Sequence, residues 1–193
     1  MLEVQLRPLA ISDLARVLEW SRDEAFCLAN GWPVGLPAEQ LQDWFVRLIN
    51  NPPADLIRKG IVVKTAQYPE GHLVGFVDLR ELNPLERRAR LRIAIGDEVH
   101  RGQGVGYAAG LQMLEHGFTE LGLDRITAEI HSSNARMRNL VERIGFVREG
   151  ILRQHETRQG IREDVHLYGM LREEFQPLEL PLIEALSADS ESR

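Results

Sequence analysis

Apolar and polar residues alternate along residues 88–95. From residue 91 every second position is leucine or isoleucine, and arginine or alanine lies between them. The apolar set is Leu91, Ile93 and Ile95, and the intervening set is Arg90, Arg92 and Ala94. A period of two predicts a β-strand with one buried face.

The same patterning predicts the elements on either side of this strand. Alternating residues predict strands over residues 2–8, 57–65, 72–82, 125–131 and 165–171, with another that begins at residue 146. Apolar residues at helical spacing predict helices that begin near residues 12, 38, 107 and 134. Residues 21–37 are rich in glycine and proline, so we expect a loop there.

The order of these elements predicts the fold class. Several central strands follow one another without a helix between them, which argues against a doubly wound parallel sheet. We expect an α/β (α+β) fold with a mixed, mostly antiparallel central sheet flanked by helices. A single domain is predicted over residues 1–176. Residues 177–193 are rich in Pro, Ser and Glu, and we expect a weakly ordered tail there.

A glycine-rich turn follows the strand over residues 88–95. It comprises Arg101, Gly102, Gln103, Gly104, Val105 and Gly106. Glycine lets the backbone approach a ligand closely, and the N-terminus of the following helix carries partial positive charge. The turn is therefore a candidate phosphate-binding site.

Two other interpretations of these glycines are open. An ordinary tight turn would need only one or two of them. The segment Gly104–Ala109 also satisfies the G-x-G-x-x-A pattern of dinucleotide-binding folds, but that fingerprint follows its strand directly, whereas Gly96–Gln103 intervene here. A Walker phosphate loop is excluded because no Gly-Lys-Ser/Thr follows.

Two motifs resemble those of the GCN5-related N-acetyltransferase (GNAT) family. Arg101-x-x-Gly104-x-Gly106 resembles the family signature R/Q-x-x-G-x-G/A, and residues 134–146 resemble its second motif, N-x-x-(S/A)-x-x-(L/V)-x-x-x-x-G-F. Residues 149–153 are typical of the RimJ/RimL-like branch, which also includes spermidine acetyltransferases. The resemblance extends to about Phe175 and implies the GNAT fold.

The resemblance also implies the activity and the co-substrate. Acetyl-CoA would donate its acetyl group directly to a primary amine in a ternary complex, without an acyl-enzyme. Amides of residues 101–106 would hold the pyrophosphate. Ile93 and Ile95 of the central strand would lie beside the thioester, and an N–H near Ile95 would polarise its carbonyl. Asn134 would cap its helix and bind the pantetheine arm.

Glu156 is the candidate general base. It falls on the position of the base proposed for RimL-type enzymes, and a base is needed because a protonated amine has no lone pair with which to attack. The alternative is a surface glutamate that pairs with Arg153 or Arg158. Glu129 and His131 are rival bases.

The sequence offers no evident general acid. Val141 and Met137 occupy positions at which family members carry tyrosine or serine, and neither side chain can donate a proton. The thiolate would leave through water, through a side chain such as Tyr168, or unassisted. Further polar candidates are His131, Ser132 and Ser133.

The acceptor is expected to be a peptide N-terminus or a small-molecule amine, selected by residues 21–37 and the 153–164 connection. Spermidine acetyltransferases carry a glutamate at the position of Arg90, and a positive charge there would repel a polycation unless Arg90 faces solvent. The missing tyrosine and serine leave a non-catalytic acyl-CoA-binding module of the same fold as the alternative. A dinucleotide-binding oxidoreductase is a third candidate.

Composition narrows the partners. The net charge of −6 argues mildly against a nucleic-acid-binding surface. Cys27 is the single cysteine, which excludes an intrachain disulfide and a cysteine-based zinc site, and we expect no metal. Residues 1–30 lack the order of a signal peptide, and no run approaches the ~20 apolar residues of a membrane helix. A cytoplasmic protein without membrane or nucleic-acid partners is expected, and a homodimer is left open.

Overall fold

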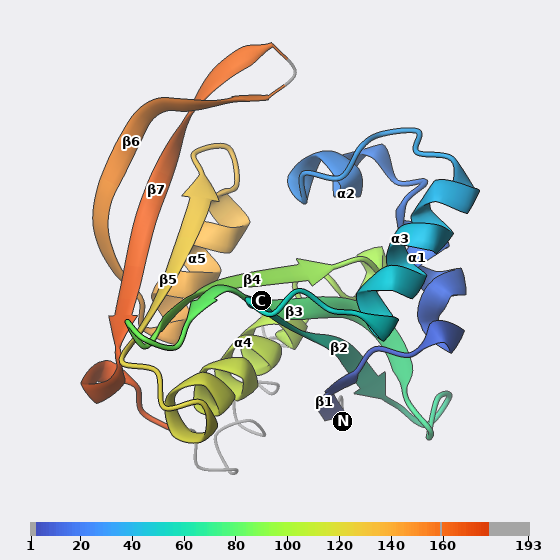
Figure 1. Cartoon of the computed structure of the whole chain (residues 1–193), viewed down its shortest axis with the longest axis horizontal. Helices are drawn as coiled ribbons and strands as arrows, with labels where there is room; N and C mark the ends of the chain where they lie inside the picture. The colour runs from blue at the N-terminus through green and yellow to red at the C-terminus, as the bar shows by residue number, and fades with distance from the viewer. Residues whose placement is uncertain (1–2, 159, 178–193) are drawn as a thin grey trace.

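The computed structural model describes residues 3–158 and 160–177, which form a seven-stranded sheet with helices on both faces (Figure 1). The strands are β1 (Glu3–Pro8), β2 (Leu56–Lys64), β3 (His72–Asn83), β4 (Arg88–Ile95), β5 (Arg125–His131), β6 (Val147–Arg158) and β7 (Ile161–Leu171). The helices are α1 (Leu14–Trp20), α2 (Glu24–Ala29), α3 (Ala38–Asn50), α4 (Val105–Glu115) and α5 (Ala135–Ile144). The predicted tail lies outside the described residues except for Pro177.

Short helical turns complete the described chain. Three are 3₁₀ turns, at Ile11–Asp13, Glu98–His100 and Arg172–Glu174, and a π-helical turn at His116–Glu120 continues α4. Among the described residues, no helix combines the length and the apolar character that crossing a bilayer requires.

The strand order is β1-β2-β3-β4-β5-β7-β6, and β4–β5 is the parallel pair in an otherwise antiparallel sheet. The predicted mixed, mostly antiparallel sheet is therefore confirmed. The parallel ladder is short, since it runs only from the pair Arg88–Arg125 to the pair Arg90–Thr127. Beyond Arg90 the two strands diverge, and this divergence opens the centre of the sheet (Figure 1).

Apolar side chains bury both faces of the sheet. Ala89 and Leu91 of β4 belong to a core under α4 and α5, and Ile93 packs against it. On the opposite face, Ala94 joins Phe76 in a second core with residues of α1, α2 and α3. The prediction of a single buried face for β4 was therefore wrong, because the N-terminal helices cover its second face.

The predicted loop over residues 21–37 contains a helix, α2. Asp23 begins it by accepting a hydrogen bond from the Phe26 N–H at 3.0 Å. The side chains of Phe26 and Cys27 are buried, which anchors this short helix to the second core. The glycine and proline residues that suggested a loop lie after α2, at Gly31 to Pro37.

The predicted 153–164 connection is also different from a loop. β6 extends to Arg158 and β7 begins at Ile161, so this segment is the far end of a long antiparallel hairpin. The ladder shifts its register between Leu152 and Glu156, and Gln154 has a φ of 50°. This irregularity bends the hairpin, which projects beyond the rest of the sheet in Figure 1.

Candidate active site

A cleft of about 870 Å³ lies where β4 and β5 diverge. Residues of α2, β3, β4, β5, β6 and α5 line it together with the glycine turn. The lining includes most of the predicted site residues, namely Ile93, Ile95, Arg101, Gly102, Gly104, Gly106, Asn134 and Glu156. Gln103 and Val105 are not part of the lining. The side-chain amide of Gln103 donates to the Val99 carbonyl at 2.7 Å, and the Val105 side chain is buried in the core.

The turn presents backbone donors at one end of this cleft. Gly102 and Gly104 have φ values of 85° and 79°, and a Cβ at either position would meet no atom within 4 Å. The Ala108 N–H donates to the Gly104 carbonyl at 3.0 Å and so makes the first hydrogen bond of α4. The amides of Val105, Gly106 and Tyr107 precede this bond and are the free donors of a helix N-terminus, which suits a phosphate group.

Arg101 shapes the turn. Its Nε donates to the Ile95 carbonyl and its Nη2 to the Gly96 carbonyl, each at 3.0 Å, and Nη2 also lies 3.2 Å from a carboxylate oxygen of Asp23. Its own amide donates to the Glu98 carbonyl. The predicted phosphate contact from the Arg101 amide therefore has no free donor. The side chain instead ties the turn to the end of β4 and to the beginning of α2.

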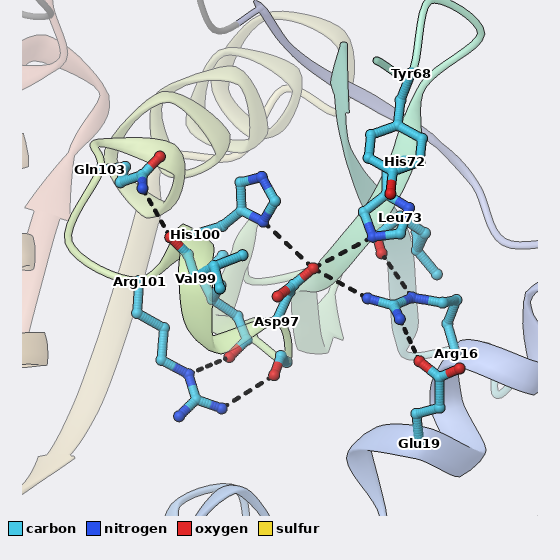
Figure 2. Close-up of polar contacts among 12 residues, drawn as sticks. Arg16, Glu19, Tyr68, His72, Leu73, Asp97, Val99, His100, Arg101 and Gln103 are labelled. Carbon is cyan, nitrogen blue, oxygen red and sulfur yellow. Dashed lines mark hydrogen bonds and ion pairs between the residues drawn. The ribbon is translucent and has the colours of Figure 1, made fainter. Parts of the chain in front are cut away.

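Asp97 fixes the other side of the same turn (Figure 2). One of its carboxylate oxygens lies 3.0 Å from Nη2 of Arg16, 3.2 Å from Nε2 of His72 and 3.3 Å from Nδ1 of His100. The Asp97 side chain is only 16% exposed. Its contacts join α1, β3 and the segment before the glycine turn, so α1 and β3 hold the end of the cleft at which the turn lies.

The last residues of β4 offer a backbone donor to the cleft. The Gly96 N–H donates to the Val74 carbonyl of β3 at 2.9 Å. Successive N–H groups of a strand point to opposite edges. The N–H of Ile95 therefore points away from β3 and into the gap left by β5, which is the position expected for a group that polarises a thioester carbonyl.

α5 forms another wall of the cleft, beside the beginning of α4. Asn134 caps this helix by accepting the Met137 N–H at 3.1 Å, which leaves the two amide hydrogens of its side chain available to a ligand. Arg136, Asn139 and Arg143 follow at helical spacing and line the cleft. These three residues had not been predicted, although the polar stripe within the second motif was the available signal.

The candidate base lies in the same cleft, and it is paired. A carboxylate oxygen of Glu156 lies 2.6 Å from Nε2 of His131, and both side chains belong to the cleft lining. Glu156 is 46% exposed and His131 is 23% exposed. The structure thus joins two of the predicted rivals into one carboxylate–imidazole pair. No pairing of Glu156 with Arg153 or Arg158 is found in the described part of the chain.

Ion pairing and hydrogen bonds occupy the other polar candidates. Glu129 lies 2.8 Å from Nη2 of Arg90, so its carboxylate is already engaged in an ion pair. The Ser133 N–H donates to Glu163 at 2.6 Å, and the Ser132 hydroxyl lies 3.3 Å from the same carboxylate oxygen. Burial raises the pKa of Glu163, but the hydrogen bonds from Ser133 and the charges of His131 and Arg158 together leave the pKa below its usual range.

The family profile for the acetyltransferase (GNAT) domain matches residues 3–147. The chain belongs to the GNAT acetyltransferase family. The predicted family is thereby confirmed, and with it the prediction of an acetyltransferase with acetyl-CoA as co-substrate.

Relatives of this GNAT protein carry two kinds of name. The putative ribosomal N-acetyltransferase YdaF of Bacillus subtilis (strain 168) is 27% identical over 150 residues, which cover 72% of this chain and 81% of that protein. The spermidine N(1)-acetyltransferase of Vibrio cholerae is 31% identical over 133 residues, which cover 69% of this chain and 75% of that protein. Both names agree with the predicted RimJ/RimL-like branch, which includes enzymes of these two kinds.

The fold is shared with a solved structure that contains the co-substrate's product. A crystal structure of spermidine N-acetyltransferase from Vibrio cholerae in complex with CoA and spermine superposes with a TM-score of 0.76 at 26% identity. The match covers 89% of this chain and 96% of that chain. The two proteins therefore share their fold over most of both chains.

The structure excludes Tyr168 as the general acid of this GNAT protein. Its hydroxyl donates to the Glu142 carboxylate of α5 at 2.8 Å, and its side chain is buried in the core rather than in the cleft. Burial and this hydrogen bond raise the pKa of Tyr168 to about 12. Val141 is also buried, whereas Met137 lines the cleft without a proton to donate.

Proposed function

We propose that this chain transfers the acetyl group of acetyl-CoA to a primary amine by direct attack in a ternary complex. The observation that carries the proposal is the position of the His131–Glu156 pair. It lines the same cleft as the glycine turn and Asn134, so a proton acceptor and the CoA-binding motifs face one space. Direct transfer requires this proximity, because the amine must reach the thioester without an intermediate on the protein.

The proposed CoA site follows the free donors of the cleft. The pyrophosphate binds the amides at the beginning of α4, where Gly104 leaves the backbone accessible. Arg143 of α5, whose guanidinium carbon lies 5.4 Å from the centre of the Tyr107 ring, adds positive charge beside the turn, and Arg136 adds a second cation to the cleft lining. The pantetheine arm runs past Asn134 toward Ile95, whose N–H donates to the thioester carbonyl.

The proposed reaction then needs one proton acceptor. The amine nitrogen forms a bond to the carbonyl carbon, the oxygen takes up negative charge, and the bond from carbon to sulfur breaks as the intermediate collapses. Glu156 accepts the proton of the amine, and His131 holds the carboxylate in place. In the absence of an acidic side chain at the positions of Val141 and Met137, the CoA thiolate leaves without a protein donor and is protonated by water.

Two acceptor classes follow from the relatives, a protein N-terminus and a polyamine. The structure places Arg90 in the cleft lining, between Glu81 and Glu129 at 2.8 Å from each. Arg90 therefore pairs with both carboxylates and cancels one of the two negative charges that would otherwise attract a polycation. This arrangement favours a peptide N-terminus or a small-molecule amine over spermidine.

The release of free CoA thiol tests the proposal. Acetyl-CoA is incubated with separate panels of N-terminal peptides, amino acids, amino sugars and polyamines, while calorimetry measures acetyl-CoA binding to the same preparation. We expect amine-dependent thiol release with at least one non-polyamine panel. Binding without release across every panel would instead support the alternative of a non-catalytic acyl-CoA-binding module.

A further inference from the structure

Arg92 of β4, the central strand, lines the cleft that also contains the glycine turn and Glu156. On its strand it lies opposite Asp78 of β3, which in turn lies opposite Arg58 of β2. Arg58 binds both oxygens of Asp78 at 2.6 Å, and Asp78 is 1% exposed. The carboxylate nearest to Arg92 along the sheet is therefore already paired with another guanidinium.

The remaining contacts of Arg92 are uncharged. Its Nη2 donates to the Asn30 carbonyl after α2, and its guanidinium carbon lies 6.0 Å from the centre of the Phe76 ring. Within residues 3–158 and 160–177, no carboxylate oxygen lies within 4.0 Å of an Arg92 nitrogen. Its neighbour Arg90, by contrast, has two carboxylate partners.

The cost of this arrangement is visible in the charge of Arg92. Burial lowers the pKa of its guanidinium to about 10, the negative charge of Asp78 opposes this shift, and the positive charges of Arg58 and Arg80 add to it. Arg92 still carries its positive charge at neutral pH. A partly buried cation without a paired anion is unfavourable for folding, so its retention in the lining of a cleft points to an anion that arrives with the ligand.

The position of Arg92 relates such an anion to the reacting amine. Ile95 lies three positions after Arg92, which corresponds to about 10 Å between their Cα atoms along a strand. A guanidinium offers five N–H donors in a planar fork that fits the two oxygens of a carboxylate. The Asn30 carbonyl accepts only one of these N–H groups, on Nη2. The long Arg92 side chain can cover much of this distance, so an acceptor whose carboxylate lies a few bonds from its amine would span the remainder between the guanidinium and the thioester.

We propose that the acceptor is an amine that also carries a carboxylate, and that Arg92 binds this carboxylate. This inference rests on the proposed function and names the acceptor class of the same cleft. The carboxylate has two possible sources, the α-carboxylate of a free amino acid or the acidic side chain at a peptide N-terminus. Both present the same chemistry to Arg92.

Matched acceptors that differ only in charge test the inference. The first pair is L-alanine and L-alaninamide, and the second pair is the peptide amide Asp-Ala-Ala and its Asn-Ala-Ala counterpart. For each pair we measure kcat/KM of thiol release and, by calorimetry, binding to the complex of the protein with CoA. Wild type, Arg92→Gln and Arg92→Lys are compared with Arg88→Gln, which removes an exposed arginine from the same strand outside the cleft.

We expect the charged member of at least one pair to be preferred by tenfold or more, and Arg92→Gln to abolish this preference while acetyl-CoA affinity stays unchanged. Arg92→Lys keeps part of it, because it keeps the charge without the fork. Arg88→Gln behaves as wild type. Which pair responds identifies the source of the carboxylate. Equal treatment of both members by wild type, or a preference that survives Arg92→Gln, overturns the inference. Selective binding without thiol release would uphold the anion site and refute the proposed acetyl transfer.

Discussion

Nε2 of His131 lies 2.6 Å from a carboxylate oxygen of Glu156, although β7 separates their strands in the sheet. An ionised carboxylate can only accept a hydrogen bond, so Nε2 carries the proton in this contact. The imidazole thus fixes one oxygen of Glu156 and leaves the other free to accept a proton from the amine. The pair has the geometry of a general base and its positioning residue.

Glu156→Gln should therefore abolish most turnover at neutral pH. Glutamine keeps the shape of the side chain but cannot accept the proton, and general base catalysis typically contributes about 10²–10⁴-fold. Acetyl-CoA affinity should persist, because Glu156 is not one of the residues to which we assign CoA binding. Activity should partly return at high pH, where the free amine is abundant. The measurement is kcat/KM across pH together with calorimetry of acetyl-CoA binding.

His131→Asn separates positioning from proton transfer. If Glu156 is the base, this variant should lose about tenfold in kcat/KM while keeping the pH profile of the wild type. A wild-type pH profile in Glu156→Gln, with full activity, would make Glu156 an ordinary surface carboxylate. A larger loss in His131→Asn than in Glu156→Gln, with a changed pH profile, would make His131 the base.

Gly104→Ala should weaken acetyl-CoA binding by at least tenfold. Gly104 has a φ of 79°, and its missing Cβ leaves open the space in which we place the pyrophosphate. Gly35 is a matched control, since its φ is 73°, its Cβ would also meet nothing within 4 Å, and it lies outside the cleft lining. Each substitution should cost about 1–2 kcal/mol of stability through backbone strain.

Only the Gly104 variant should lose acetyl-CoA affinity by calorimetry, while denaturant unfolding shows similar losses of stability in both. Equal affinities for acetyl-CoA in the two folded variants would show that the pyrophosphate lies elsewhere.

The sequence predicted the parts of the site whose geometry is local. The strand over residues 88–95, the glycine turn and the helix after it follow one another along the chain, so periodicity and glycine spacing were sufficient to place them. The cap at Asn134 is equally local, because its acceptor bond reaches only to Met137. These parts are the ones to which we assign the binding of CoA.

The part of the cleft in which we place the acceptor, namely α2, Arg92 and the His131–Glu156 pair, depends on contacts between distant segments. α2 is short, and it is held by the packing of Phe26 against the second core and by the contact of Asp23 with Arg101. The isolation of Arg92 could not be read from its strand, because it arises only when Arg58, two strands away, pairs with Asp78 on the adjacent strand. The pairing of His131 with Glu156 depends likewise on the bend in β6.

Asp97→Asn should destabilise the fold and the phosphate turn together. The substitution removes the negative charge on which Arg16, His72 and His100 converge, in a largely buried position, and we expect a loss of about 1–3 kcal/mol in the free energy of unfolding. Acetyl-CoA affinity should fall as well, because the segment before the turn loses its anchor.

Asp124→Asn is the control for this charge. Asp124 also pairs with two arginines, Arg87 and Arg172, but it is 53% exposed, so its loss should cost less than about 1 kcal/mol and leave acetyl-CoA affinity unchanged. Urea unfolding and calorimetry measure both quantities. Equal destabilisation by the two substitutions would contradict the role of burial, and unchanged affinity in Asp97→Asn would separate the cluster from the CoA site.

Asp23 should make the clasp between α2 and the turn sensitive to acid. The hydrogen bond from the Phe26 N–H lowers the pKa of the Asp23 carboxyl, partial burial opposes this shift, and the charge of Arg101 adds to it. A lowered pKa means that the charge contributes stability above the unfolded pKa of about 3.9, and that this contribution disappears as the pH falls through the folded pKa.

Asp23→Asn keeps a capping oxygen and removes the charge. Urea unfolding at pH 7 should show the variant less stable by under about 1 kcal/mol, because the pair is partly exposed. The difference should shrink to zero in strong acid, and a difference that stays constant down to pH 2 would show that the charge of Asp23 contributes nothing.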